Sequence, residues 1–195
     1  RNLYIESKRN QLSLAFASSD QIQNIESLKR FLREIWFHIY KETRFTLNIY
    51  GKICQYFKKD EKNLKLKNVY LKGFIEDRKK LDLDLVKNSI FLSPTFVGSG
   101  YRTKILEAGT IGMPVICTTF DFEAFSDYFE PGKHILVADR KDEFLKILKG
   151  IENGIISLEN ISQEFHLRIK RVFDWDVTAK KFISLYEQLT EKNKL

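Results

Sequence analysis

The sequence has little of what marks secreted, membrane-spanning or multi-domain chains. Among its 195 residues are 2 cysteines, 3 prolines and 1 methionine. Cys54 and Cys117 fit no metal or redox spacing, so we interpret both as small apolar side chains of a protein from a reducing compartment. No apolar run reaches the roughly 18 residues of a transmembrane helix. Without a proline-rich or low-complexity tract or an internal repeat, the chain offers no linker, and we expect one domain.

Positive charge is in excess. The 33 lysines and arginines outnumber the 26 acidic residues, which gives a net charge of +7. Lysine dominates and is spread along the chain, without the arginine and aromatic clusters of a nucleic-acid surface. This balance suits phosphate ligands or an anionic membrane face and does not decide between them. We expect a cytoplasmic protein that binds no nucleic acid, with the inner face of the membrane as the place of any peripheral association.

The chain begins with Arg1, and its one methionine is Met113. We therefore expect a fragment of a longer protein whose upstream part lies outside these residues. Hydrophobic residues make up 43% of the sequence, which is enough for a sizeable core.

Short β-prone runs alternate with helical stretches. The expected strands are Leu12–Ala17, Phe45–Tyr50, Asn68–Ile75, Ser89–Ser93, Pro114–Thr118 and His134–Ala138. The expected helices are one capped by Asn24 and running to Ile39, then Asp77–Lys87, Arg102–Ile111, Lys141–Asn153, Leu158–Phe173 and Val177–Lys192. Continuously apolar strands that alternate with helices are typical of a parallel sheet covered on both faces. We predict a Rossmann-like, doubly wound α/β domain of about six strands, with C-terminal helices packed across one side.

Apolar spacing predicts which side chains face the core. The expected core positions include Ile25, Leu28, Phe31, Leu32, Ile35 and Ile39 of the first helix, Leu81, Leu85 and Val86 of the second, and the aromatic residues Phe16, Trp36 and Trp175. Ligands of doubly wound domains bind beyond the carboxyl ends of the strands. The loops to inspect are therefore residues 18–23, 51–53, 73–77, 95–102 and 118–123.

Residues 93–125 carry the most chemistry. A strand ends at Pro94, a turn holds Gly98 and Gly100, and a helix begins with Arg102 and Lys104 in its first turn. Unpaired N–H groups, close approach at glycine and the helix dipole together favour an anion. Acidic residues would stabilise this helix start better than basic ones, so the two cations indicate a phosphate ligand.

Glu107 lies one turn further along this helix. Helical side chains lean toward the N-terminus, so its carboxylate can point back at the turn and take both hydroxyls of a ribose. The small residues Ala108, Gly109 and Gly112 let the helix approach the sheet closely. The plainer interpretation is that Lys104 and Glu107 pair on a solvated face and that the glycines are ordinary loop residues.

Taken together, these motifs resemble the hallmark of group 1 glycosyltransferases, retaining enzymes with the two-domain B-type fold. The matching elements are Ser93-Pro94, the turn from Gly98 to Gly100, Leu106-Glu107-Ala108, Gly112-Met113-Pro114-Val115, Ile49-Tyr50-Gly51, Val69 to Phe74, Glu130-Pro131-Gly132 and Phe173-Asp174-Trp175. The resemblance covers about residues 12–189. It implies that residues 1–195 are a single C-terminal, donor-binding domain and that the N-terminal acceptor domain is absent from this chain.

The resemblance also implies site residues. The donor would contact Glu107 through its ribose, Gly98, Ser99, Gly100, Tyr101, Arg102, Thr103 and Lys104 through its diphosphate or sugar, and Phe74 and Ile75 through its base. Ser99 stands where many members carry a first glutamate. The loop from Ser18 to Asn24 lacks the family's cations, so Arg102, Lys104 and Lys52 are expected to neutralise the phosphates.

The implied reaction transfers a hexosyl group from a UDP-, GDP- or ADP-sugar to a polysaccharide or lipid-linked glycan, in polysaccharide biosynthesis, with the fragment alone inactive. No cofactor or metal is implied, since the pair Asp82 and Asp84 falls in a helix; no catalytic residue is identified, and the histidines form no catalytic group. The alternatives are a non-catalytic nucleotide-sugar-binding or interaction module and a sugar-nucleotide epimerase of similar fold.

Overall fold

A computed structural model describes residues 1–7, 11–59, 67–98 and 102–192. Within these residues six strands form one sheet, and every neighbouring pair is parallel. The strands are β1 (Ser13–Ala17), β2 (Thr46–Tyr50), β3 (Val69–Gly73), β4 (Ile90–Ser93), β5 (Val115–Cys117) and β6 (Leu136–Val137). The predicted doubly wound α/β fold is confirmed.

The strand order is β3-β2-β1-β4-β5-β6. The chain therefore runs outward from β1 to β3, crosses back to β4 and runs outward the other way. The order reverses between β1 and β4, which pair through Leu14 with Ile90 and Ala15 with Phe91. Doubly wound domains bind ligands at such a switch point, because the loops that follow the two strands diverge there.

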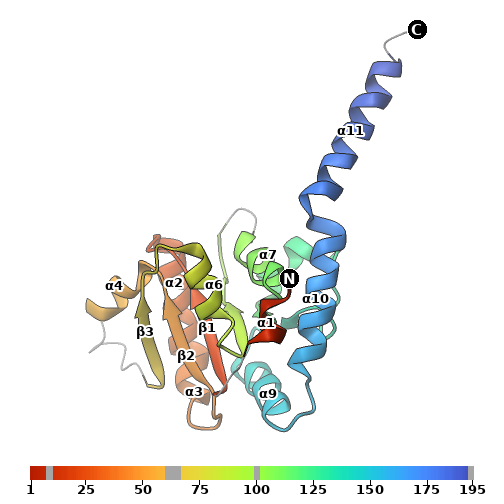
Figure 1. Ribbon diagram of the computed structural model, residues 1–195. Helices are drawn as coiled ribbons and strands as arrows, with labels where there is room; N and C mark the ends of the chain where they lie inside the picture. The colour runs from red at the N-terminus through yellow and green to blue at the C-terminus, as the bar shows by residue number, and fades with distance from the viewer. Residues whose placement is uncertain (8–10, 60–66, 99–101, 193–195) are drawn as a thin grey trace.

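Helices lie on both faces of the sheet (Figure 1). They are α1 (Leu3–Glu6), α2 (Ile22–Phe31), a π-helical turn (Leu32–Trp36), α3 (Phe37–Ile39), α4 (Ile53–Lys59), α6 (Arg78–Leu85), α7 (Thr103–Thr110), α8 (Thr119–Phe122), a 3₁₀ turn (Glu123–Phe125), α9 (Lys141–Glu152), α10 (Leu158–Phe173) and α11 (Trp175–Lys192). α2 contacts α4, α3 contacts α9, and the π-helical turn contacts α2, α3 and α9, whereas α7 and α1 pack on α10.

The first long helix follows its predicted pattern with two differences. Its apolar positions from Ile25 to Ile39 are buried as expected, although a π-helical turn interrupts it. The N-cap residue is Gln21, so the prediction that Asn24 caps the helix is wrong. Asn24 lies in the first turn, and its amide donates to Ser19 Oγ over 3.1 Å.

The end of the chain differs from the expected packing. α10 packs on α7, but α11 extends away from the rest of the molecule (Figure 1), so the prediction that the C-terminal helices pack across one side of the domain is wrong for α11. Trp175 is 85% exposed, which makes its predicted place in the core wrong. The backbone turns out of α10 at Asp174, and the helix that follows no longer runs along the domain.

Glycines allow two close approaches, one at the carboxyl edge of the sheet and one between α7 and α10. Gly51 has a φ of +102°, and a Cβ there would overlap the carbonyl oxygen of Ser18. Ser18, the residue after β1, therefore contacts the end of β2. Its N–H donates to Tyr50 O over 3.0 Å. A Cβ at Gly109 would meet Phe165 and Ile169, so this small residue admits α10 rather than the sheet.

Candidate functional site

Two helices begin at the switch point. α2 starts just beyond β1 and α7 just beyond β4. Neither N-cap residue, Gln21 or Arg102, makes a side-chain capping hydrogen bond in the described residues, and neither first turn contains an acidic residue. Each helix start therefore keeps the partial positive charge of its backbone N–H groups.

A pocket of about 200 Å³ lies between these two helix starts. It is lined by Phe16, Ser19, Gln21, Gln23, Asn24, Ser27, Ser93, Thr95, Val97, Gly98, Arg102, Thr103 and Lys104. Most of these side chains are polar, and both cations come from the start of α7. The pocket is therefore suited to a small anionic group.

Lys104 reaches across the switch point. Its Nζ donates to Ser18 Oγ over 2.6 Å and to Asn24 Oδ1 over 3.2 Å. Burial lowers the pKa of Lys104 to about 8, while the carboxylates of Asp121 and Glu107 oppose this shift. At neutral pH the side chain is still mainly protonated. Among the described residues its ammonium group donates hydrogen bonds to neutral oxygens, and it lies 5.7 Å from the ring centroid of Phe16. The plainer interpretation, a Lys104–Glu107 pair, does not describe this geometry.

Ser27 is buried on the same pocket wall. Its Oγ has no hydrogen-bond partner among the residues that the structure describes. A buried hydroxyl without a partner costs free energy, so such a group in a pocket indicates a place for a polar ligand atom or water.

Arg102 is held from behind by Asp121. The Arg102 Nε lies 2.6 Å from Asp121 Oδ1, close enough for an ion pair although the N–H is not aligned for a hydrogen bond. The guanidinium also lies 4.9 Å from the centroid of Phe120. The sequence predicts that Arg102 contacts the phosphates. The structure places Arg102 on the pocket wall and pairs it with Asp121, and its contact with the phosphates stays a prediction.

Glu107 lies outside the pocket, on the exposed side of α7. Its Oε2 accepts a 2.8 Å hydrogen bond from Arg78 Nη1, and the two side chains are 48% and 51% exposed. Arg78 is the first residue of α6, directly after Asp77, whose carboxylate caps that helix. Glu107 is thus joined to the loop that follows β3, where the base-binding residues were expected.

The remaining predicted residues lie around β3. Lys52 Nζ is 5.4 Å from the ring centroid of Phe74, a cation–π distance. Phe74 lines an open groove along the edge strand β3, and Ile75 packs partly against the core. Lys52 does not line the pocket that holds Lys104, so its expected contact with phosphates stays a prediction.

The structure thus brings together part of the predicted site. Gly98, Arg102, Thr103 and Lys104 line one pocket, whereas Ser99, Gly100 and Tyr101 lie outside the described residues. The sequence did not identify Ser18, Asn24, Ser27, Asp121 or Arg78 as site residues. One available signal was position, because each of the five lies at or near the loop that follows a strand of a parallel sheet.

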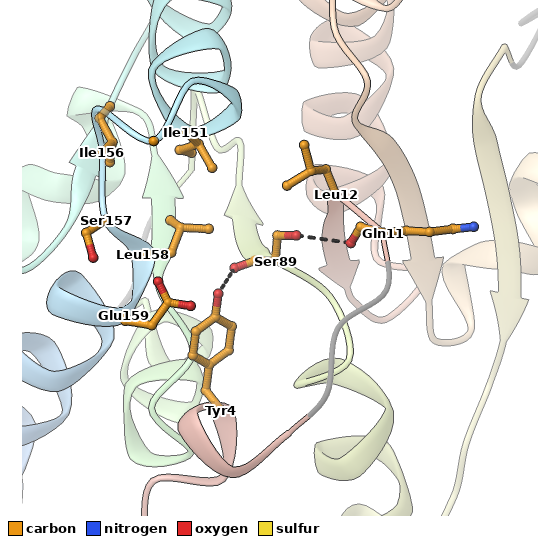
Figure 2. Close-up of a pocket in the computed structure, with 10 residues that line it drawn as sticks. Tyr4, Gln11, Leu12, Ser89, Ile151, Ile156, Ser157, Leu158 and Glu159 are labelled. Atoms are coloured by element: carbon orange, nitrogen blue, oxygen red, sulfur yellow. Dashed lines mark hydrogen bonds between the residues drawn. The ribbon is translucent and has the colours of Figure 1, made fainter.

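A pocket of about 500 Å³ lies at the opposite edge, before β1 and β4 (Figure 2). The hydroxyl groups that line it already form hydrogen bonds within the fold. Tyr4 Oη donates to Ser89 O over 2.7 Å, and Ser89 Oγ donates to Gln11 O over 3.3 Å. Ser157 Oγ accepts from Asn160 N at the start of α10. This pocket is larger, but it offers less unused chemistry than the one at the switch point.

The described part of the chain has no helix suited to span a membrane and no cluster of side chains suited to hold a metal ion. None of its helices is both long and apolar enough to cross a bilayer. No group of three or more histidine, cysteine or acidic side chains is arranged there to hold a metal ion. Both cysteines are buried free thiols, and burial raises the pKa of each.

Fold and site define a doubly wound α/β domain with a cationic pocket at its switch point. A family model, described as glycosyl transferases group 1, matches residues 11–153. The chain belongs to this family, which confirms the resemblance seen in the sequence motifs. No curated protein matches the sequence at a significant level.

Solved structures share the fold at low sequence identity. A mutant of S. aureus TarM, in complex with Fondaparinux, alpha-GlcNAc-glycerol and UDP, has a TM-score of 0.69 and 18% identity over 93% of this chain and 36% of that one. The C-terminal domain of the Francisella tularensis group 1 protein LpcC has a TM-score of 0.63 and 14% identity over 89% and 92%. Anabaena HepE with UDP-glucose has a TM-score of 0.59 and 14% identity over 95% and 49%. The chain thus spans about a third to a half of the two longer proteins.

Proposed function

We propose that this chain is the donor-binding domain of a two-domain glycosyltransferase and binds the diphosphate of a nucleotide sugar at the switch point. The observation that carries the proposal is the position of Lys104. It holds a positive charge between two helix starts, and its hydrogen bonds within the described residues go to the neutral oxygens of Ser18 and Asn24. A phosphate oxygen would replace these neutral acceptors with a charged one and add the attraction between two opposite charges, which is stronger in a buried site than in water.

The nucleoside is proposed to extend from the pocket toward β3. Glu107 lies one turn beyond Lys104 on α7, and Arg78 joins it to the start of α6. A carboxylate has roughly four lone-pair sites, so the contact with Arg78 leaves acceptor capacity for ribose hydroxyls. Phe74 and Ile75, in the loop between β3 and α6, would then contact the base.

The proposed reaction is retaining transfer of a hexosyl group to a glycan or lipid-linked acceptor, on the cytoplasmic side of the membrane. In it the domain positions the donor and offsets the charge of the leaving diphosphate. Acceptor contacts would come from an upstream half, so we expect this chain alone to be inactive. UDP is the first ligand to try, because UDP and UDP-glucose are named in the TarM and HepE structures.

Calorimetry tests the proposal with UDP, GDP and ADP and with their nucleosides. We expect weak binding of one nucleoside diphosphate, because one half of an interdomain cleft binds less well than the whole. Lys104→Ala should weaken that diphosphate by about 10-fold or more and leave the nucleoside unchanged. Lys146→Ala, which removes an exposed lysine from α9, is the matched control.

Two results would count against the proposal. Absence of binding at millimolar concentrations of every diphosphate would favour a non-catalytic interaction module instead. Equal losses of affinity for diphosphate and nucleoside in Lys104→Ala would contradict the claim that the phosphates bind at Lys104.

A further inference from the structure

Asp121 is a fully buried carboxylate next to the pocket, and the stability of the fold does not explain it. It lies in α8, beyond β5, with 0% of its surface exposed. Moving a carboxylate out of water costs several kcal/mol unless partners compensate, and apolar residues often stabilise a core as well as a buried ion pair does. Burial raises the pKa of Asp121 above its ordinary value despite its hydrogen bonds, so folding disfavours the charged form.

The partners of the Asp121 carboxylate in the described part of the chain belong to the pocket wall. Its Oδ2 accepts from Ser93 Oγ over 2.6 Å and from Thr95 N over 3.3 Å. Its Oδ1 faces Arg102 at the start of α7. Each of these three residues lines the pocket, whereas Asp121 itself does not. One carboxylate therefore contacts the end of β4, the loop after it and the start of α7, from the side of these segments that faces away from the pocket.

A neighbouring residue supports the same segment. Thr118, at the N-cap of α8, donates its hydroxyl to Thr95 O, and the N–H of Asp121 donates to Thr118 Oγ1 over 3.3 Å. Both backbone polar groups of Thr95 are thus fixed by the start of α8. The wall of the pocket takes its shape from residues beyond β5 that do not line it.

Arg102 and Lys104 differ in their contact with Asp121. Asp121 forms an ion pair with Arg102, whose side chain is 15% exposed. The hydrogen bonds of Lys104 within the described residues go to neutral oxygens instead. Of the charged groups that act on Lys104, Asp121 and Glu107 raise its pKa and Arg102 lowers it. Loss of the Asp121 charge would therefore make Lys104 easier to deprotonate.

We propose that Asp121 is a positioning residue of the donor site, which holds Arg102 and the segment from Ser93 to Thr95 in the geometry that receives the diphosphate. This inference rests on the proposed function, because it concerns the same pocket. Asp121 touches no ligand in this account and acts through Arg102 and the loop.

The test compares Asp121→Asn with the unchanged chain, using UDP or whichever diphosphate the unchanged chain binds. Asparagine keeps the size of the side chain and an oxygen for Ser93 and Thr95. We expect diphosphate affinity to fall about 10-fold while nucleoside affinity and the circular dichroism spectrum stay the same. Asp142→Asn, which neutralises an exposed carboxylate on α9, should change neither affinity.

Two readouts separate positioning from a merely structural role. In an Arg102→Gln background, Asp121→Asn should cost much less affinity, since the residue through which it acts is gone. The pH at which diphosphate binding is lost should also be lower in Asp121→Asn, because Lys104 loses a favourable charge. If Asp121→Asn does not fold, Ser93→Ala serves as the milder variant and should weaken the diphosphate selectively, by less.

The outcomes are distinct. Unchanged diphosphate affinity in Asp121→Asn would overturn the inference and leave the donor proposal intact. Parallel losses for diphosphate and nucleoside with a lower melting temperature would also overturn it, since they show a structural role only. If the unchanged chain binds no diphosphate, the proposed function fails and this inference fails with it.

Discussion

The two edges of the sheet differ in how their polar groups are used. At the amino edge a pocket of about 500 Å³ is lined by Tyr4, Ser89 and Ser157, whose hydroxyls all bond within the fold. At the carboxyl edge a pocket of about 200 Å³ holds the Ser27 hydroxyl, which has no partner among the described residues, and the Lys104 ammonium, which donates to the neutral oxygens of Ser18 and Asn24. The comparison teaches that unused hydrogen-bonding capacity, rather than volume, distinguishes a candidate binding site from a gap between elements.

The largest expected effect concerns Glu107 at the carboxyl edge. In the proposed two-domain enzyme, Glu107→Gln should weaken donor binding and reduce turnover by about 10- to 100-fold, because hydrogen bonds to a carboxylate are worth about 1.5–3 kcal/mol. Donor dissociation constants and steady-state rates measure this. If Glu107 serves only its exposed pair with Arg78, the change costs less than about 1 kcal/mol and leaves activity alone.

The next largest effect is the pH dependence of diphosphate binding at the carboxyl edge. Lys104 has a pKa of about 8 in the free domain, so its charge is present at pH 7 and is lost as the pH rises through that value. Diphosphate affinity should fall by up to about 10-fold between pH 7 and 9, whereas nucleoside affinity should not change. Lys104→Arg keeps its charge over this range, and a steep fall in that variant too would exclude Lys104 as the cause.

At the amino edge we expect an effect on stability alone. Tyr4→Phe removes the hydroxyl that donates to Ser89 O and leaves a buried carbonyl group without that donor. The free energy of unfolding should decrease by about 1 kcal/mol, as a denaturant titration would show, while diphosphate affinity stays constant. A clear loss of diphosphate affinity would mean that the amino-edge pocket takes part in binding, either directly or through coupling to the carboxyl edge.

The smallest expected effect belongs to Ser27. Ser27→Ala removes a buried hydroxyl that has no partner among the described residues, so the free domain should gain up to about 1 kcal/mol in stability. Diphosphate affinity should fall by a few-fold if the hydroxyl contacts the ligand. Unfolding curves with and without UDP check both, and a less stable free domain would show that the hydroxyl was satisfied.

The sequence predicted those parts of the molecule that depend on local pattern. Apolar runs such as the one in β4, helical spacing as in α2 and the cations after the glycine turn predicted the strands, the helix faces and the start of α7. It could not predict contacts that the sheet order creates. Asn24 meets Lys104 because β1 and β4 are neighbours, and Asp121 meets Arg102 because β5 follows β4.

Trp175 shows the other limit. An apolar side chain predicts burial only if the helix that carries it packs on the domain, and α11 leaves the domain at Asp174. Tertiary packing also decides the partner of Glu107. The sequence predicted the helix that carries Glu107 but not its hydrogen bond with Arg78, which lies at the start of α6, 29 positions away.

The most direct test of the carboxyl-edge assignment is an NMR titration of the domain with UDP, observed through the backbone amides. Our account predicts the largest shift changes at the two helix starts, residues 22–24 and 103–105, with a smaller response near Arg78 and Glu107. Uridine should leave the helix starts nearly unchanged. Changes centred on Tyr4, Ser89 and Ser157, or equal responses of the helix starts to UDP and uridine, would contradict the claim that the switch point binds the diphosphate.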